Sequence, residues 1–82
     1  MKTFCVSYDL RCDDRNYEPL RERLLDLNGE NILESVWVLE LPISWTCKML
    51  KEYLKKYISE DEDGLFIAEI KDEPVLINPI ID

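Results

Sequence analysis

MKTFCVSYD, residues 1–9, alternates apolar and polar side chains with the period of a β-strand. Phe4, Val6 and Tyr8 fall on one face of such a strand, and Ser7 and Asp9 fall on the other with the half-polar Cys5. The strand therefore ends on a carboxylate, directly before the charged loop at residues 10–15. A carboxylate in this place is either a turn former or a functional group.

A helix is predicted over residues 17–28. Asn16 can cap its first turn, which tolerates Pro19 because the first N–H groups of a helix have no partner within it. Apolar side chains recur at helical spacing at Tyr17, Leu20, Leu24 and Leu27. Asn28-Gly29 then predicts a left-handed end to the helix.

The stretch NILESVWVLEL, residues 31–41, again has strand periodicity. It is either one long strand or two short strands joined tightly near Glu34-Ser35, and in the first case Leu33 and Trp37 share a face opposite Ile32. Pro42 ends this stretch, and Ser44 can cap a second helix. The apolar stripe of that helix is Leu50, Leu54, Tyr57 and Ile58.

The rest of the chain contains a polar turn and two extended segments. SEDEDG at residues 59–64 is typical of a solvated turn and lacks the alternating ligand order of a calcium loop, whereas LFIAEI at residues 65–70 is dense in strand formers. The tail at residues 74–82 is apolar and extended. The order strand, helix, two strands, helix, strand predicts one α+β domain over residues 1–82, a ferredoxin-like (βαββαβ) sandwich with two helices on one face of an antiparallel sheet.

One face of that sheet stays open in a monomer, and an open apolar face usually finds a partner. We therefore expect a homodimer. The apolar tail at residues 74–82 is expected to act as an extra C-terminal strand that pairs with a sheet edge, either its own or that of the second subunit.

The net charge of −8 limits the classes of partner. The excess is spread evenly, since residues 1–41 and residues 42–82 each carry nine acids and five bases. This charge argues strongly against tight non-specific binding of nucleic acid, because the affinity of such binding comes from cations that displace counterions from the phosphates. A nucleic acid would have to meet a local basic patch.

Three cysteines and the absence of histidine bear on compartment and metal chemistry. Cys5, Cys12 and Cys47 are odd in number and widely spaced, and the sequence shows neither an apolar leader nor a long apolar run. We expect structural thiols in a reducing cytoplasm, away from membranes. The usual zinc and haem ligand sets are hard to assemble without histidine.

Several short motifs together resemble a known family. They are Tyr8-Asp9 at the end of the first strand, Ser35-Val36-Trp37 in the middle of the chain, and the acidic turn Glu60–Asp63 before the next strand. In this order and spacing they resemble the CRISPR-associated Cas-two superfamily, and within it the stand-alone SinR-like and VapD-like proteins. The resemblance implies a ferredoxin-like homodimer whose sheets face each other, with the last strand often joining the sheet of the partner.

The resemblance also implies an activity. In catalytic relatives the aspartate at the end of the first strand meets its dimer mate and holds a magnesium ion that activates water for phosphodiester cleavage, and Asp9 is the position that matches. Two carboxylates at a two-fold axis can bind a hard divalent cation through oxygen. The alternative is that Asp9 opens the loop by accepting hydrogen bonds from the N–H groups of residues 10–12.

Candidate substrate-binding residues lie close to Asp9 in the sequence. Ser7 shares its face and can hold a water molecule or a phosphate, while Arg11 and Arg15 lie where nuclease relatives contact phosphate. Each arginine has an acidic neighbour with which it can pair. Trp37 is expected in the core. Trp45 is expected to pack against the rim of the sheet, and partial exposure is the alternative.

Two functions follow from these residues. The first is a magnesium-dependent endoribonuclease or broader nuclease that acts on RNA or DNA as a dimer through Asp9. The second is a non-catalytic acidic dimer that binds a basic protein partner or mimics nucleic acid, which the evenly spread negative charge favours. Assembly into a CRISPR integration complex has less support, because no extensive basic surface is present for bridging DNA.

Overall fold

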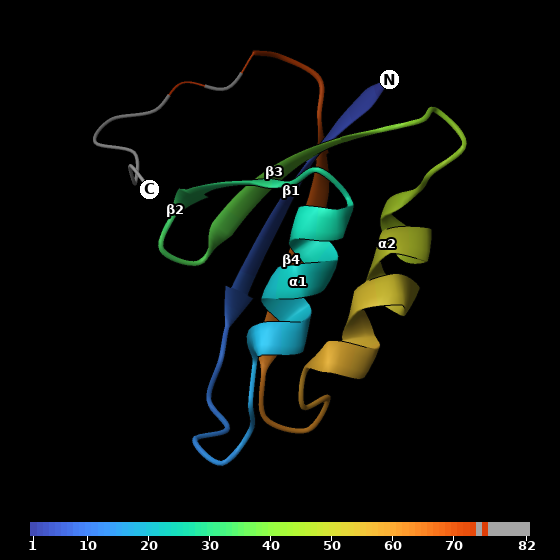
Figure 1. The fold of residues 1–82 in the computed structure, drawn as a ribbon. Coiled ribbons are helices and arrows are strands. Elements are labelled where there is room, and N and C mark those ends of the chain that lie inside the picture. Colours follow the sequence, from blue (N-terminus) through green and yellow to red (C-terminus); the bar gives the residue numbers. More distant parts are fainter. Residues whose placement is uncertain (74, 76–82) are drawn as a thin grey trace.

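The computed structural model describes residues 1–73 and residue 75, and these form two layers (Figure 1). One layer is a four-stranded sheet, and two helices lie on one of its faces. The elements in chain order are β1 (Lys2–Asp9), α1 (Glu18–Asp26), β2 (Glu30–Leu33), β3 (Val36–Leu41), α2 (Cys47–Leu54), the 3₁₀ helix η1 (Lys55–Tyr57) and β4 (Gly64–Ile70). The predicted α+β, ferredoxin-like order is confirmed. Apart from Val75, the predicted pairing of the tail at residues 74–82 lies outside the described residues.

Strand β1 lies inside the sheet, whose strand order is β2-β3-β1-β4. It pairs antiparallel with both β3 and β4, so that Val6 stands opposite Trp37 on one side and Ile67 on the other. Directly opposed residues in an antiparallel pair share a face. The alternation of residues 1–9 therefore determines which face of β1, β3 and β4 is apolar.

The stretch at residues 30–41 forms two strands and a tight turn at Glu34-Ser35. β2 pairs antiparallel with β3, and the register shifts between Asn31 and Leu33. Ile32 is buried and Leu33 is 36% exposed, the reverse of what one continuous strand would give. The turn and the irregular register are the physical reason, because a one-residue shift in a strand exchanges its two faces.

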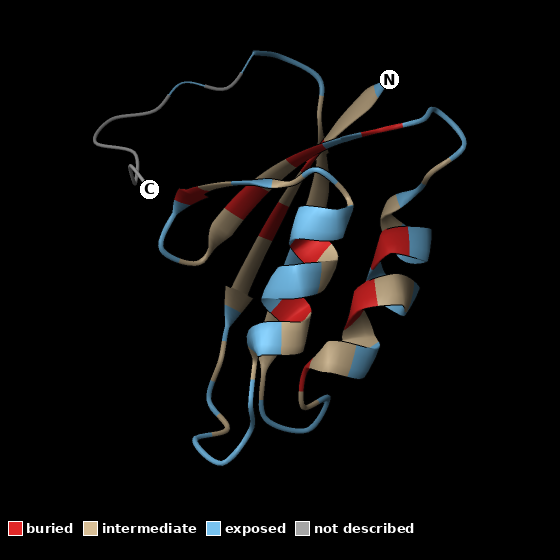
Figure 2. Cartoon of the chain, in the orientation of Figure 1, coloured by how far each residue is buried: buried red, intermediate tan, exposed pale blue. Residues whose placement is uncertain are grey.

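The hydrophobic core fills the space between the sheet and the helices (Figure 2). Trp37 is fully buried there, as expected, and its indole N–H donates to the hydroxyl of Tyr8 at 3.0 Å. The other fully buried large side chains are Phe4, Val6, Leu20, Leu24, Leu39, Leu50 and Leu54. Ile58, from the predicted stripe of the second helix, is also buried.

Helix α1 is shorter than the predicted range but ends as expected. Its N-cap is Tyr17, which makes no cap hydrogen bond with its side chain, whereas Asn16, one residue earlier, accepts a hydrogen bond from the N–H of Glu18 at 3.0 Å. Asn28 has a φ of 59°, the left-handed conformation that ends the helix. Gly29 is required for space, since a Cβ there would lie 2.7 Å from the carbonyl oxygen of Leu24 and 3.1 Å from the Trp37 ring.

Helix α2 begins two residues later than the predicted cap implies. Thr46 occupies the N-cap, and its Oγ1 accepts a hydrogen bond from the N–H of Met49 at 3.1 Å. The expectation that Ser44 caps this helix is wrong, because Ser44 and Trp45 belong to a turn in which the N–H of Trp45 donates to Pro42. Trp45 is partly exposed and packs against the core with its buried part.

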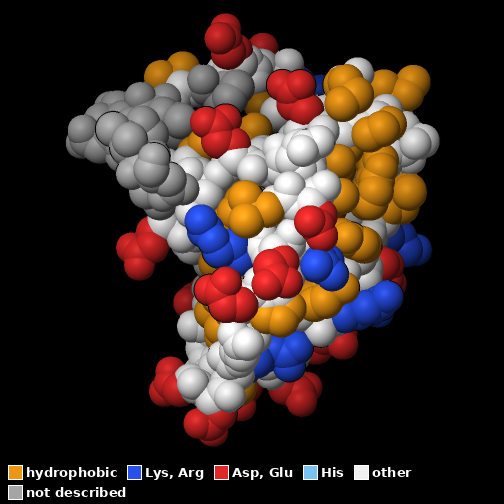
Figure 3. Space-filling model, in the orientation of Figure 1, with side chains coloured by type: hydrophobic (Ala, Val, Ile, Leu, Met, Phe, Trp, Pro, Cys, Tyr) orange, Lys and Arg blue, Asp and Glu red, His pale blue; other side chains and the backbone are white. Residues whose placement is uncertain are grey.

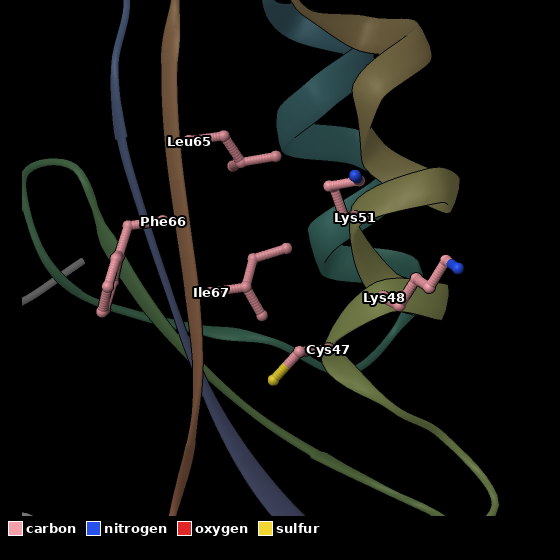
Figure 4. A pocket seen from close by; sticks show the side chains of 6 residues that line it. All are labelled: Cys47, Lys48, Lys51, Leu65, Phe66 and Ile67. Carbon is pink, nitrogen blue, oxygen red and sulfur yellow. The ribbon is translucent and has the colours of Figure 1, made fainter.

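Within residues 1–73, no helix lies on the second face of the sheet (Figure 1). The register places Cys5 of β1 between Val38 and Ala68 on this face, and Ser7 beside Phe66. Figure 4 shows Leu65 and Ile67 pointing from β4 toward α2, whereas Phe66 points away from it. Phe66 is 62% exposed, so the open face presents apolar surface.

None of the helices in the described part of the chain combines the length and the apolar character needed to cross a bilayer. The cysteines Cys5, Cys12 and Cys47 are free thiols, and each is partly exposed.

Candidate active site

Asp9 is the last residue of β1 and stands opposite Gly64, the first residue of β4. By the alternation of the strand it shares the open face with Cys5 and Ser7. Its side chain is 68% exposed. The fold therefore presents this carboxylate at one end of the open sheet face.

The loop after β1 folds Arg11 back onto Asp9. The Nε and Nη2 groups of Arg11 both lie 2.9 Å from Oδ2 of Asp9, and Nη1 donates to the carbonyl oxygen of Glu62 at 3.2 Å. The guanidinium thus neutralises one oxygen of the carboxylate. The other oxygen, Oδ1, accepts no hydrogen bond from a described residue.

A different carboxylate holds the loop in place. Asp63 accepts hydrogen bonds from the N–H of Arg11, the N–H of Ser59 and the hydroxyl of Tyr17, all between 2.6 and 2.7 Å. Burial acts to raise the pKa of Asp63, but these hydrogen bonds outweigh it and lower the pKa to about 2. Burial and the bond to Asp63 raise the pKa of Tyr17 to about 12.

The hypothesis that Asp9 opens the loop by accepting N–H groups is therefore wrong for residues 11 and 12. The N–H of Arg11 goes to Asp63, and the N–H of Cys12 donates to the hydroxyl of Tyr17 at 3.2 Å. The expectation that the whole acidic run is solvated is also wrong in one position, because Asp63 is partly buried while Glu60, Asp61 and Glu62 are exposed.

A shallow cleft of about 440 Å³ adjoins Asp9 and is lined by Tyr8, Asp9, Leu10, Glu34 and Ser35. The N–H of Tyr8 donates to the carbonyl oxygen of Ser35 at 3.1 Å. This bond holds the turn between β2 and β3 beside the end of β1, so that the turn lines the cleft together with Asp9. Glu34 is thus a second carboxylate at this cleft. The sequence pattern did not single it out, because only the pairing of β1 with β3 brings the turn beside Asp9.

The two remaining candidates differ in their surroundings. Ser7 lies in β1 between Val36 and Phe66, on the face of Asp9. Arg15 donates from Nε to the carbonyl oxygen of Tyr57 and from Nη2 to that of Lys56, at 3.4 and 3.0 Å. Arg15 therefore binds the end of η1 and not the acids beside it in the sequence, and its contact with phosphate stays a prediction.

The family model for CRISPR associated protein Cas2 matches residues 1–75. The chain belongs to the Cas2 family. A search of curated proteins finds no match. Membership of the Cas2 family agrees with the observed order of strands and helices. The matched range includes Asp9, Arg11 and the turn at Glu34.

The donors at Asp9 suit a hard cation in this Cas2 fold. Magnesium prefers oxygen ligands, keeps several water molecules and needs only one or two carboxylates from the protein. Oδ1 of Asp9 offers one such ligand. Among residues 1–73 and 75, no group of three or more His, Cys, Asp or Glu side chains is arranged to hold a metal ion. Within the chain, the other carboxylate that lines the same cleft is that of Glu34.

Proposed function

We propose that this Cas2 protein is a homodimer whose open sheet faces pack together and whose two Asp9 side chains form a magnesium-dependent nuclease site. The observation that supports the proposal is the position of Asp9. It lies at the end of the helix-free sheet face, its side chain is 68% exposed, and Oδ1 has no hydrogen bond within the described residues. Two sheets that meet on this face about a two-fold axis would bring the two carboxylates together.

In the proposed site, Asp9 would be a metal ligand and Arg11 would bind the substrate. Asp9 from each subunit would supply Oδ1 as a ligand, and the bound magnesium ion would lower the pKa of a coordinated water molecule. Arg11 lies beside Asp9 with an exposed guanidinium, so it can leave Oδ2 and bind a phosphate oxygen of the substrate. An exposed ion pair of this kind is weak, and its exchange for a phosphate costs little.

The test is cleavage of single-stranded RNA and of DNA by the purified protein, with magnesium and with EDTA. We expect Asp9→Asn to lower the magnesium-dependent rate at least about 100-fold, because the variant loses the charged ligand from both subunits. Asp14→Asn, an exposed acid in the following loop, is the matched control and should keep the rate. Cleavage that Asp9→Asn leaves unchanged would contradict the proposal and would indicate a contaminating nuclease.

A non-catalytic acidic dimer is the second candidate, and the ion pair between Arg11 and Asp9 favours it. In this case Arg11 would serve to neutralise the carboxylate. With the net charge of −8, the surface would then steer a basic protein or mimic a nucleic acid. The protein would be a dimer without nuclease activity, and it would retain basic partners at low salt and release them at high salt.

The proposal also includes a role for the tail at residues 74–82 and a branch of the Cas2 family. We infer that residues 74–82 add a strand to a sheet edge of the second subunit, which would cover the edge strand β4. We also place the protein with the stand-alone SinR-like and VapD-like proteins, which the Tyr8-Asp9 and Ser35-Val36-Trp37 motifs support. A variant that ends at residue 73 should lose dimer stability if the tail pairs in this way.

A further inference from the structure

An apolar groove runs along the outer side of α2 and the loop before it, on the helix-covered side of the sheet and not on its open face. It has a volume of about 460 Å³ and is lined by Trp45, Thr46, Lys48, Met49, Glu52 and Tyr53. Figure 3 shows hydrophobic side chains gathered over this part of the molecule, at the right of the view, with Lys and Arg side chains beside them. The groove shares no lining residue with the cleft at Asp9.

Large apolar side chains are exposed in the groove and beside it. Met49, in its lining, is 46% exposed, and Ile43, in the loop before α2 but outside the lining, is 72% exposed. Trp45 and Tyr53 also line the groove and are partly buried against the core. The rings of Trp45 and Tyr53 meet edge to face, with centroids 6.1 Å apart and planes at 86°. Trp, Tyr and Met are enriched at the centres of protein interfaces, where they fill pockets of the partner or form them.

The same part of the chain has a local excess of positive charge, although the whole chain is negative. Residues 42–58 carry four lysines and one glutamate, whereas the other residues carry six bases and seventeen acids. The one acid, Glu52, is paired with Lys55, which lowers the pKa of Glu52 through their hydrogen bond. Lys48 and Lys51 interact with Glu52 through charge alone and have no hydrogen bond or ion pair with a described residue, so their ammonium groups can donate to a partner.

Lys48 and Lys51 extend the basic rim of the groove toward β4. Both line a second hollow of about 350 Å³ together with Cys47, Leu65, Phe66 and Ile67 (Figure 4). Lys48 lines the groove and this hollow alike. The apolar groove is thus bordered by free ammonium groups on the side that faces the sheet edge.

We propose that the groove binds a short amphipathic segment of a partner protein that has aliphatic or aromatic anchors flanked by Asp and Glu. The apolar lining takes the anchors, and the rim lysines attract the carboxylates. Single-stranded nucleic acid fits less well, because the perpendicular rings of Trp45 and Tyr53 do not form a flat stacking platform. The surface is independent of the proposed nuclease site, so either can fail alone.

The first experiment is selection of a phage-displayed library of random linear peptides on the immobilised full-length protein. We expect enriched sequences in which aromatic or aliphatic residues alternate with an excess of Asp and Glu over Lys and Arg. No enrichment, or enrichment of basic sequences, would overturn the proposal.

The second experiment measures the affinity of the best enriched peptide by fluorescence anisotropy. Met49→Glu should weaken binding at least about tenfold, because it places a charge in the apolar centre of the groove. Leu33→Glu makes the same change at an exposed leucine in β2 and should leave the affinity within about twofold. Equal losses in both variants, or none in either, would contradict a site at the groove.

A charge exchange tests the role of the lysines. The double variant Lys48→Glu and Lys51→Glu should bind the acidic peptide at least about tenfold more weakly. It should also gain affinity for a peptide whose acids are replaced by Lys at the same positions. Competition by a single-stranded RNA oligomer that Met49→Glu abolishes would instead identify a nucleic-acid surface and overturn the proposal.

Discussion

Asp63 and Asp9 have different roles: Asp63 holds the loop after β1 in place, and Asp9 presents an accessible carboxylate. Asp63 is partly buried and accepts hydrogen bonds from the N–H groups of Arg11 and Ser59. Asp9 is exposed and, among the described residues, is bound by the side chain of Arg11 alone. An aspartate that already accepts several hydrogen bonds is a poor ligand for a further group. Asp63 therefore releases Asp9 from holding the loop, and Asp9 remains accessible to a ligand.

The role of Asp63 predicts the effect of Asp63→Asn. We expect the free energy of unfolding to fall by about 2 kcal/mol at pH 7, because the variant loses charge-assisted hydrogen bonds. Denaturation with urea, followed by circular dichroism, measures this change. Asp61→Asn is the control, since Asp61 lies in the same turn and is exposed. An equal loss in both variants would show that charge in the turn, and not the bonds of Asp63, is responsible.

The same substitution predicts a dependence on pH. Folding lowers the pKa of the Asp63 carboxyl from 3.8 to about 2, so the charged form stabilises the fold. That contribution is complete above the unfolded value of 3.8 and is lost as the pH falls through about 2. The stability difference between the native protein and Asp63→Asn should therefore be constant at neutral pH and narrow between about pH 4 and pH 2. A difference that grows on acidification would contradict this assignment.

At the scale of elements, the start of α2 depends on one hydroxyl. Ser44 and Thr46 both have the side chain of a helix cap. Thr46, with φ −127° and ψ 163°, lies directly before the helix, whereas Ser44 lies in the turn that the bond from Trp45 to Pro42 closes. The helix then directs Leu50 and Leu54 into the core. Its opposite side, with Met49, remains on the surface.

Thr46→Ala should lower the free energy of unfolding by about 1 kcal/mol, because the N–H of Met49 loses its acceptor. Ser44→Ala should change it by less than about 0.5 kcal/mol, as expected for an exposed site away from a cap. Thermal denaturation of the two variants side by side gives the comparison. If Ser44→Ala were the more harmful change, the assigned start of α2 would be wrong.

At the scale of the whole molecule, the described helices cover one face of the sheet and leave the second face without a helix (Figure 1). The proposed dimer forms through the second face. The proposed peptide groove lies on the outer side of α2, which covers the first face. Phe66 is exposed on the second face, and Met49 is exposed in the groove. Phe66 also borders the adjoining hollow but does not line the groove itself, so one substitution at each tests the two surfaces.

Phe66→Glu should weaken dimerisation at least about 100-fold, because an unpaired charge in an interface costs roughly 3 kcal/mol or more. Met49→Glu should leave the mass of the dimer unchanged. Sedimentation equilibrium over a range of protein concentrations measures both. A native protein with the mass of a single subunit would refute the dimer, and with it the shared site at Asp9, but it would leave the peptide groove untouched.

The sequence by itself determined the order of the elements, the apolar face of β1, the burial of Trp37 and the overall negative charge. It also placed Asp9 at the end of the first strand and on the face away from the core. These features follow from periodicity and composition, which act over neighbouring residues and can be seen in any short window of the chain.

Only the tertiary structure decided which carboxylate holds the loop, which residues line the cleft, and where the free lysines meet an apolar groove. Tyr17 and Asp63 are 46 positions apart, and the turn at Glu34 reaches Asp9 through the pairing of β1 and β3. Such contacts depend on how the strands and helices pack, and they leave no periodic trace in the sequence. For this reason Asp63 and Glu34 could not be distinguished from other surface acids until the chain was folded.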